Sequence, residues 1–175
     1  MKKPLSVVAL CLVAACGGAG GSTTSLSTSS SSGLNTIPID ALPQVAVSET
    51  PSQTFGSMLN GVRSGAGAGA LSHDARLGVA ARRHANDMAA NDVWGHIGSD
   101  GSTVGQRVTD AGYTWSAVGE NVARGQSDEQ AVLDAWMGSS GHRANNLNPN
   151  FEDFALAKAN SPRGTYWVLV LARER

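Results

Sequence analysis

Near the C-terminus the chain carries six consecutive apolar or aromatic residues, Tyr166-Trp167-Val168-Leu169-Val170-Leu171. Successive side chains of a β-strand point to opposite faces, so a strand that is apolar at every position must be covered on both sides. We therefore expect a central strand over residues 165–172. A second strand is expected over residues 154–158, joined to the first by the turn residues of segment 160–164.

Helical periodicity marks most of the chain before these strands. Apolar residues recur at helix spacing from Phe55 to Val62, and a longer stripe from Leu77 to Met88 predicts the longest helix, capped by Ser72 or Asp74. His84 lies on this stripe and is expected to be a core residue.

The middle of the chain is expected to be mixed. A short helix is expected over residues 103–110 and a strand over 118–123. The pair Ser127 and Gln130 resembles a capping box that opens a further helix. Helices first, strands last and one strand buried twice predict an α+β fold, a three-layer α-β-α sandwich.

The N-terminus has the pattern of an export signal. Two lysines precede a short apolar run that ends at Ala15, too short to span a bilayer as a helix. Small residues before Cys16 resemble the lipobox of bacterial lipoproteins, so we expect a lipoprotein signal peptide over 1–15 and a lipid on Cys16. An ordinary cleaved signal with an incidental cysteine is the alternative.

This interpretation divides the chain into three parts. Residues 16–51, rich in Gly, Ser, Thr and Pro, are expected to form a flexible tether, and residues 52–175 a single folded domain. The absence of an aspartate directly after Cys16 favours the outer membrane or cell surface as the destination. The membrane partner would be reached through the lipid on Cys16.

Composition excludes several kinds of site. Beyond Cys11 and Cys16 there is no cysteine, so the domain has no disulfide, thiolate metal site or cysteine nucleophile. Without Lys2 and Lys3 the chain holds 11 basic and 14 acidic residues, a net charge of about −3, which gives no reason to expect nucleic-acid binding. We expect a monomer.

Three polar segments, each with glycine beside or near the polar residue, carry the candidate site. They are centred on His96, on Glu120 in Gly119-Glu120-Asn121, and on His142 in Ser140-Gly141-His142-Arg143. The spacings of 24 and 22 residues fit no local metal motif, so only the fold could bring these side chains together.

An ordered series of residues resembles the bacterial branch of the CAP superfamily, named after cysteine-rich secretory proteins, antigen 5 and pathogenesis-related 1 proteins and also called SCP-like. The resemblance covers about 115 residues and rests on Leu59-Asn60-x-x-Arg63, Ala81-x-x-His84-Ala85-x-x-Met88-Ala89, His96, Asp100-Gly101-Ser102, Arg107, Ala111-Gly112-Tyr113, Gly119-Glu120-Asn121-Val122-Ala123, Trp136-Met137-x-Ser139-x-Gly141-His142-Arg143-x-Asn145, Pro149, Phe151 and Tyr166-Trp167.

The resemblance implies an α-β-α sandwich with an open cleft lined by two histidines and two glutamates that can bind a divalent metal. His96 and Glu120 match the first histidine and one glutamate, and His142 resembles the second histidine although Arg143 follows it. Ser139 stands where the second glutamate is usual, so the chain lacks one of the four ligands that the resemblance implies.

Two chemical interpretations of the three residues remain open. Two imidazoles and one carboxylate can hold Zn²⁺ or another divalent cation with an open position for water. A hydrogen-bonded cluster that fixes loops without metal is the other interpretation. Asn121, Arg143 and Asn145 are expected to support the cluster.

Three functions follow from these alternatives. The favoured one is an envelope-tethered binding module that holds a lipid, sterol-like or envelope ligand in its cleft. The second is a metal-dependent hydrolase of peptide, ester or cell-wall substrate, with Glu120 as third ligand or as the candidate catalytic base. The third is an envelope interaction protein with an inert cleft.

Overall fold

The computed structural model describes residues 52–175. The predicted signal peptide, the lipid site at Cys16 and the tether lie outside the described residues. Within residues 52–175, no helix has the length and apolar character needed to cross a membrane.

One four-stranded sheet forms the centre of the domain. Its strands are β1 (Ser72–His73), β2 (Trp115–Arg124), β3 (Asp153–Ser161) and β4 (Gly164–Glu174). The spatial order is β1-β3-β4-β2; β1 pairs with β3 in parallel, and the other neighbours pair antiparallel. The long apolar run therefore lies in β4 between two neighbours, as the sequence predicts, and β2 forms an edge of the sheet.

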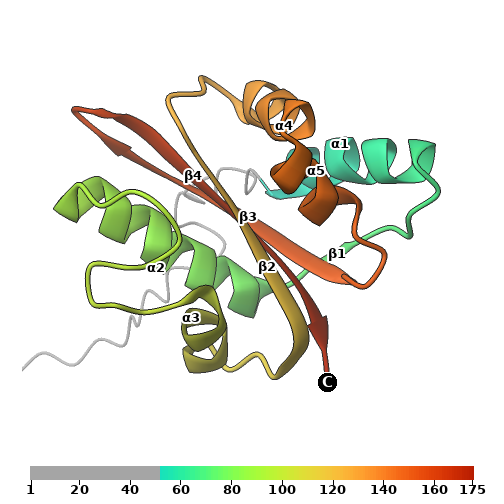
Figure 1. Cartoon of the computed structure of the whole chain (residues 1–175), viewed down its shortest axis with the longest axis horizontal. Helices are drawn as coiled ribbons and strands as arrows, with labels where there is room; N and C mark the ends of the chain where they lie inside the picture. Colours follow the sequence, from blue (N-terminus) through green and yellow to red (C-terminus); the bar gives the residue numbers. More distant parts are fainter. Residues whose placement is uncertain (1–51) are drawn as a thin grey trace, which may run out of the picture. The chain divides into compact units, whose positions relative to one another are not determined.

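Five helices cover the two faces of the sheet. They are α1 (Ser52–Gly65), α2 (Ala75–Asn91), α3 (Val104–Asp110), α4 (Glu129–Gly138) and α5 (Ser140–Leu147). Helices α2 and α3 lie on one face, and α1, α4 and α5 lie on the other (Figure 1). The predicted three-layer α-β-α sandwich is confirmed.

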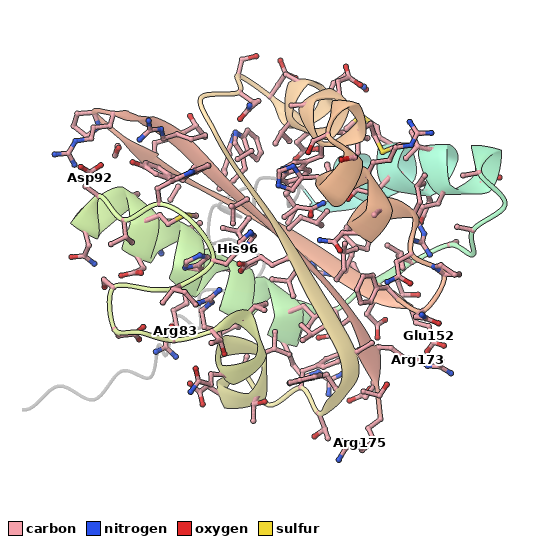
Figure 2. The ribbon with its side chains drawn as sticks, viewed as in Figure 1. Arg83, Asp92, His96, Glu152, Arg173 and Arg175 are labelled. Carbon is pink, nitrogen blue, oxygen red and sulfur yellow. The ribbon has the colours of Figure 1, made fainter. Side chains whose placement is uncertain are left out.

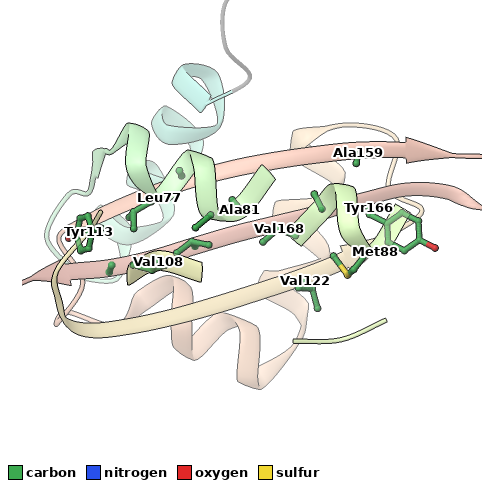
Figure 3. Close-up of a cluster of buried hydrophobic side chains, with 14 residues drawn as sticks. Leu77, Ala81, Met88, Val108, Tyr113, Val122, Ala159, Tyr166 and Val168 are labelled. Carbon is green, nitrogen blue, oxygen red and sulfur yellow. The ribbon is translucent and has the colours of Figure 1, made fainter. Parts of the chain in front are cut away.

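The side chains of β4 divide alternately between two hydrophobic cores. Tyr166 and Val168 pack under α2 and α3 (Figure 3), whereas Trp167 and Leu169 pack against α1 and α4. This alternation is the period-two geometry of a strand, and it explains why the middle of β4 is apolar on both faces.

Two local predictions need correction. The N-cap of α4 is Asp128, whose carboxylate accepts a hydrogen bond from the backbone N–H of Ala131, so Ser127 and Gln130 do not form the predicted capping box. Thr103 and Gln106 form a capping box at the start of α3 instead. Of the two proposed caps for α2, Asp74 is the one used, and Ser72 belongs to the short strand β1, which periodicity does not reveal.

Helix α1 depends on a close approach to the sheet at Gly56. A Cβ atom at Gly56 would lie 2.6 Å from the ring of Phe154, which is buried in the core between α1 and β3. Gly61, on the same helix, has no atom within 4 Å of the equivalent point. The two glycines therefore separate the effect of packing from the effect of helix propensity.

We predict opposite outcomes for alanine at these positions. Gly56→Ala should lower the free energy of unfolding by about 1–3 kcal/mol, because the Phe154 ring must move within a packed core. Gly61→Ala should raise it by about 0.5–1 kcal/mol through helix propensity alone. Urea unfolding followed by circular dichroism measures both, and equal effects at the two positions would contradict the packing argument.

Candidate functional site

Glu120 lies on the edge strand β2 and points to the face covered by α2 and α3. Its carboxylate is almost fully buried, with 5% of the residue exposed. The preceding Gly119 is required by packing on the opposite face, because a Cβ atom there would lie 2.8 Å from the ring of Phe151. The strand can therefore sit tightly between the two helical layers at this point.

Arg107, on α3, neutralises Glu120. Its Nη2 donates a hydrogen bond of 2.8 Å to Oε2 of Glu120, and both side chains are about 2% exposed or less. The same guanidinium donates to the backbone carbonyls of Ser102, at 2.7 Å, and of His96, at 3.0 Å. Arg107 thus joins α3, the loop that carries His96, and β2 through one buried charge.

His96 completes this group from the loop between α2 and α3 (Figure 2). Its Nδ1 lies 2.9 Å from Oε1 of Glu120. The carboxylate is the acceptor, so Nδ1 carries the proton and Nε2 is the free nitrogen of the neutral ring. With 53% of its side chain exposed, His96 presents Nε2 outside the buried ion pair.

Residues of helix α2 hold the loop that carries His96 through hydrogen bonds. Nε2 of His84 donates to the carbonyl of Gly95 at 2.8 Å, and Asp87 accepts hydrogen bonds from the backbone and hydroxyl of Ser99. His84 is fully buried, and its Nε2 also lies 3.9 Å from Oε1 of Glu120. The expected core histidine is therefore also part of the surroundings of Glu120.

Asn121 points to the opposite face of the sheet and contacts α5. Its Nδ2 donates to the carbonyl of His142 at 3.1 Å and to Oδ1 of Asn146 at 2.8 Å. Asn145 donates to Oδ1 of Asn121 at 2.9 Å and to the carbonyl of Glu120 at 3.2 Å. These amides fix α5 against β2. Arg143 is exposed on the same helix.

The structure therefore brings together only part of the predicted cluster. His96 and Glu120 meet on the α2–α3 face, whereas His142 belongs to α5 on the other side of β2. Burial lowers the pKa of His142, and the charge of His96 lowers it further. The two rings therefore interact electrostatically across the edge strand. In the described residues, no hydrogen bond or ion pair joins the His142 ring to Glu120.

His142 instead lines an open cleft at the edge of the sheet. The cleft has a volume of about 460 Å³, and β2 forms its floor. Its walls come from the His96 loop on one side and from α4 and α5 on the other; the residues are Trp94, Val122, Ala123, Arg124, Gln126, Ala135, Trp136, Ser139 and His142. Ser139, in place of a second glutamate, leaves this cleft without a carboxylate.

The donor set does not fit the metal site that the family resemblance implies. Both oxygens of Glu120 are already hydrogen-bonded, one to the cationic Arg107 and one to His96. Across residues 52–175, no three His, Cys, Asp or Glu side chains are grouped so that they could hold a metal ion. Binding of zinc or another divalent cation stays a prediction, and no chemical step is assigned to it.

The sequence pattern does not reveal the role of Arg107 or of Gln126. A buried arginine gives no local signal in a short amphipathic helix, since arginine is usually exposed. Gln126 follows the end of β2, where a loop residue is expected, and its buried Oε1 has no hydrogen-bond partner among the described residues. Only the packed structure reveals either feature.

The two histidines should titrate on opposite sides of the ordinary histidine value. The hydrogen bond to Glu120 raises the pKa of His96, and burial lowers that of His142. The stabilising effect of charged His96 should be complete below its ordinary pKa of 6.5 and be lost as pH rises through its raised pKa. Above pH 6.5 the His142 ring is neutral in both the folded and the unfolded chain, so it costs no stability there. The free energy of unfolding should fall as pH drops below 6.5 and through the lowered pKa, because burial disfavours the charged ring.

NMR titration of the imidazole ring protons measures the pKa of His96 and that of His142. In His96→Asn the pKa of His142 should rise, yet stay below its ordinary value, because burial is the larger of its two causes. A His142 pKa that does not respond to His96→Asn would show that the two sides of the cleft are electrostatically independent.

Removal of the Arg107 charge should be costly. Arg107→Met leaves Glu120 buried without its cation and should lower the free energy of unfolding by about 3–5 kcal/mol. Arg83→Met is the matched control: Arg83 pairs with Asp100 and Asp110 at the surface, so its loss should cost about 1 kcal/mol or less. Urea unfolding compares the two, and similar losses would contradict the role of the buried pair.

Comparison with known proteins agrees with this architecture. Residues 57–171 match the model of the CAP family, described as the cysteine-rich secretory protein family. The protein YkwD of Bacillus subtilis is 32% identical over 111 residues, which is 63% of this chain and 42% of YkwD. The chain thus spans less than half of that relative.

Two solved structures share the fold. An extracellular protein containing an SCP domain from Bacillus anthracis has 27% identity and a TM-score of 0.66, covering 71% of this chain and 40% of the other. An outer surface protein of Borrelia burgdorferi has 19% identity and a TM-score of 0.64, covering 70% of this chain and 91% of the other. With the family match spanning most of the described domain, this chain belongs to the CAP family of cysteine-rich secretory proteins.

Proposed function

We propose that this CAP domain is an exported binding module that holds a ligand of the cell envelope in the cleft at the edge of β2. One observation carries the proposal: the cleft is open, partly aromatic, and lined by polar side chains that the protein itself leaves unused. Such a combination is typical of sites that bind rather than of surfaces that only pack.

The unused groups come from three different segments. Oε1 of Gln126 is buried without a partner among the described residues, and the hydroxyl of Ser139 makes no capping hydrogen bond to α5. The ring of His142 lines the same space and is shifted toward its neutral form, because burial lowers its pKa. Buried polar groups are normally paired, so Oε1 of Gln126 favours a ligand or ordered water as its partner. Ser139 and His142 are half-buried, which leaves their polar atoms accessible to the same ligand.

The cleft offers less support for catalysis. A serine nucleophile needs a base within hydrogen-bond reach, and no hydrogen bond between Ser139 and His142 is found in the part of the chain described. Glu120, the candidate base of the hydrolase hypothesis, is buried in an ion pair with Arg107 and does not line the cleft. Binding is therefore the function that this geometry favours.

Export is supported by two kinds of observation. The relatives include an extracellular protein and an outer surface protein, which is consistent with export. The N-terminal sequence, with Cys16 after small residues, is consistent with anchoring of the domain by a lipid. Anchorage through Cys16 at the outer membrane or cell surface is part of this proposal.

Cosedimentation tests whether the cleft binds envelope material. The protein would be the chain from Gly17 onward, which omits the predicted signal and lipid site but keeps both cores. The probes are vesicles of phosphatidylethanolamine and phosphatidylglycerol, the same vesicles with cholesterol, and purified peptidoglycan sacculi. We expect at least one probe to retain the protein.

A blocked cleft provides the specificity control. Ala135→Trp places a large ring in the cleft from the exposed side of α4 and should weaken retention about tenfold or more. Ala144→Trp, exposed on α5 and outside the cleft lining, should leave retention unchanged. If no probe retains the protein, or if Ala135→Trp binds as well as the parent, the cleft is not the binding site.

A further inference from the structure

Trp94 is an exposed aromatic side chain that is nevertheless held in place. The residue is 56% exposed and lines the cleft from the loop between α2 and α3. Its ring lies 6.4 Å from the ring of Tyr166, and the guanidinium of Arg124 lies 5.7 Å from its centre. Contacts with Tyr166 and Arg124 restrict the rotamers of the indole, so a ligand that stacks on its exposed surface costs little additional side-chain freedom.

The groups around Trp94 share a chemical character. Gln126 offers an unpaired acceptor, Ser139 a hydroxyl, and neutral His142 one donor and one acceptor. No carboxylate lines the cleft, and Arg124 is its single arginine or lysine. The site therefore suits a neutral or weakly acidic ligand with many hydroxyl or amide groups, rather than a cation.

We infer that the ligand is a carbohydrate chain, with one sugar ring stacked on Trp94 and its hydroxyl or amide groups bonded to Gln126, Ser139 and His142. The flat, weakly polar C–H face of a sugar ring matches an indole, and its rim of hydroxyls matches the unused polar groups. This inference rests on the proposed function, since it names the class of ligand for the same cleft.

An extended peptide fits the same edge of the sheet less well. Adding a strand requires free backbone groups along β2. The carbonyl of Val122 already accepts a hydrogen bond from the indole of Trp136, and the carbonyl of Glu120 accepts one from Asn145. With these carbonyls covered, recognition at the edge falls to side chains, as it does for sugars.

An acyl chain or a sterol fits less well for a different reason. Insertion of an apolar chain would cover the unpaired groups of Gln126, Ser139 and His142 without bonding them. Covering polar groups without partners opposes binding. The unused hydrogen-bonding capacity therefore favours a sugar over a lipid.

Isothermal titration calorimetry tests the inference with soluble probes. Chitotetraose, the tetramer of N-acetylglucosamine, supplies both hydroxyl and amide groups, and oleate supplies an acyl chain. We expect the chain from Gly17 onward to bind chitotetraose and to bind oleate more weakly. Trp94→Ala should weaken chitotetraose binding about tenfold, whereas Trp94→Phe should retain most of it.

Ile97→Ala is the matched control, because Ile97 lies in the same loop, is also 56% exposed, and is not part of the cleft lining. Its binding should equal that of the parent. Chitotetraose binding that is unchanged in Trp94→Ala would overturn the inference.

The outcomes separate this inference from the proposed function. Retention by vesicles or sacculi that Ala135→Trp abolishes, together with no binding of chitotetraose, would overturn the carbohydrate assignment and leave the cleft as a binding site. Failure of every probe in both experiments would overturn both.

Discussion

The buried ion pair between Arg107 and Glu120 is the interaction on which the functional face of this domain depends. A carboxylate at this depth is stable only with a compensating charge, and Arg107 supplies it while also bonding the carbonyls of His96 and Ser102. The pair thereby fixes three things at once: the position of α3, the path of the α2–α3 loop, and the tautomer of His96. Because Trp94 is on the same loop, the wall of the cleft is also set by this pair.

A second buried arginine has the matching role on the other face. Arg63 of α1 is fully buried and donates to the backbone carbonyls of Gly69, Asn146 and Asn148. Asn146 in turn accepts from Asn121 of β2. A chain of hydrogen bonds therefore runs from α1 through α5 to the edge strand. The edge strand is therefore held from both faces by polar contacts at Glu120 and Asn121, and the cleft is lined by the residues that follow them on β2.

The local sequence predicts those parts of the fold that depend on periodicity. The apolar run of β4 requires a central strand, and the stripe of α2 requires a buried helix face. The partner of Glu120 could not be predicted, because the choice of Arg107 depends on how α3 packs against β2. Strand alternation gives only a partial signal for the site: Glu120 and Asn121 are neighbours and must face opposite sides of the sheet. The hydrogen bond from Asn121 to the backbone carbonyl of His142, which places α5 on the side away from Glu120, is visible only in the structure.

Glu120 and Asn121 face opposite sides of β2, so the polar residues that match the family pattern are separated into two groups in this chain. Glu120 is neutralised by Arg107, and Ser139 stands where a second carboxylate would add negative charge to the cleft. A site that holds a divalent cation benefits from anionic ligands, whereas this cleft contains a neutral imidazole, a hydroxyl, an amide and one guanidinium. The buried carboxylate then positions His96 and its loop, and in the function proposed above the polar groups that line the cleft on the other side of β2 recognise a neutral ligand. On this proposal the His96–Glu120 pair has an architectural role, and the contacts with ligand are made by cleft residues such as Trp94 and His142.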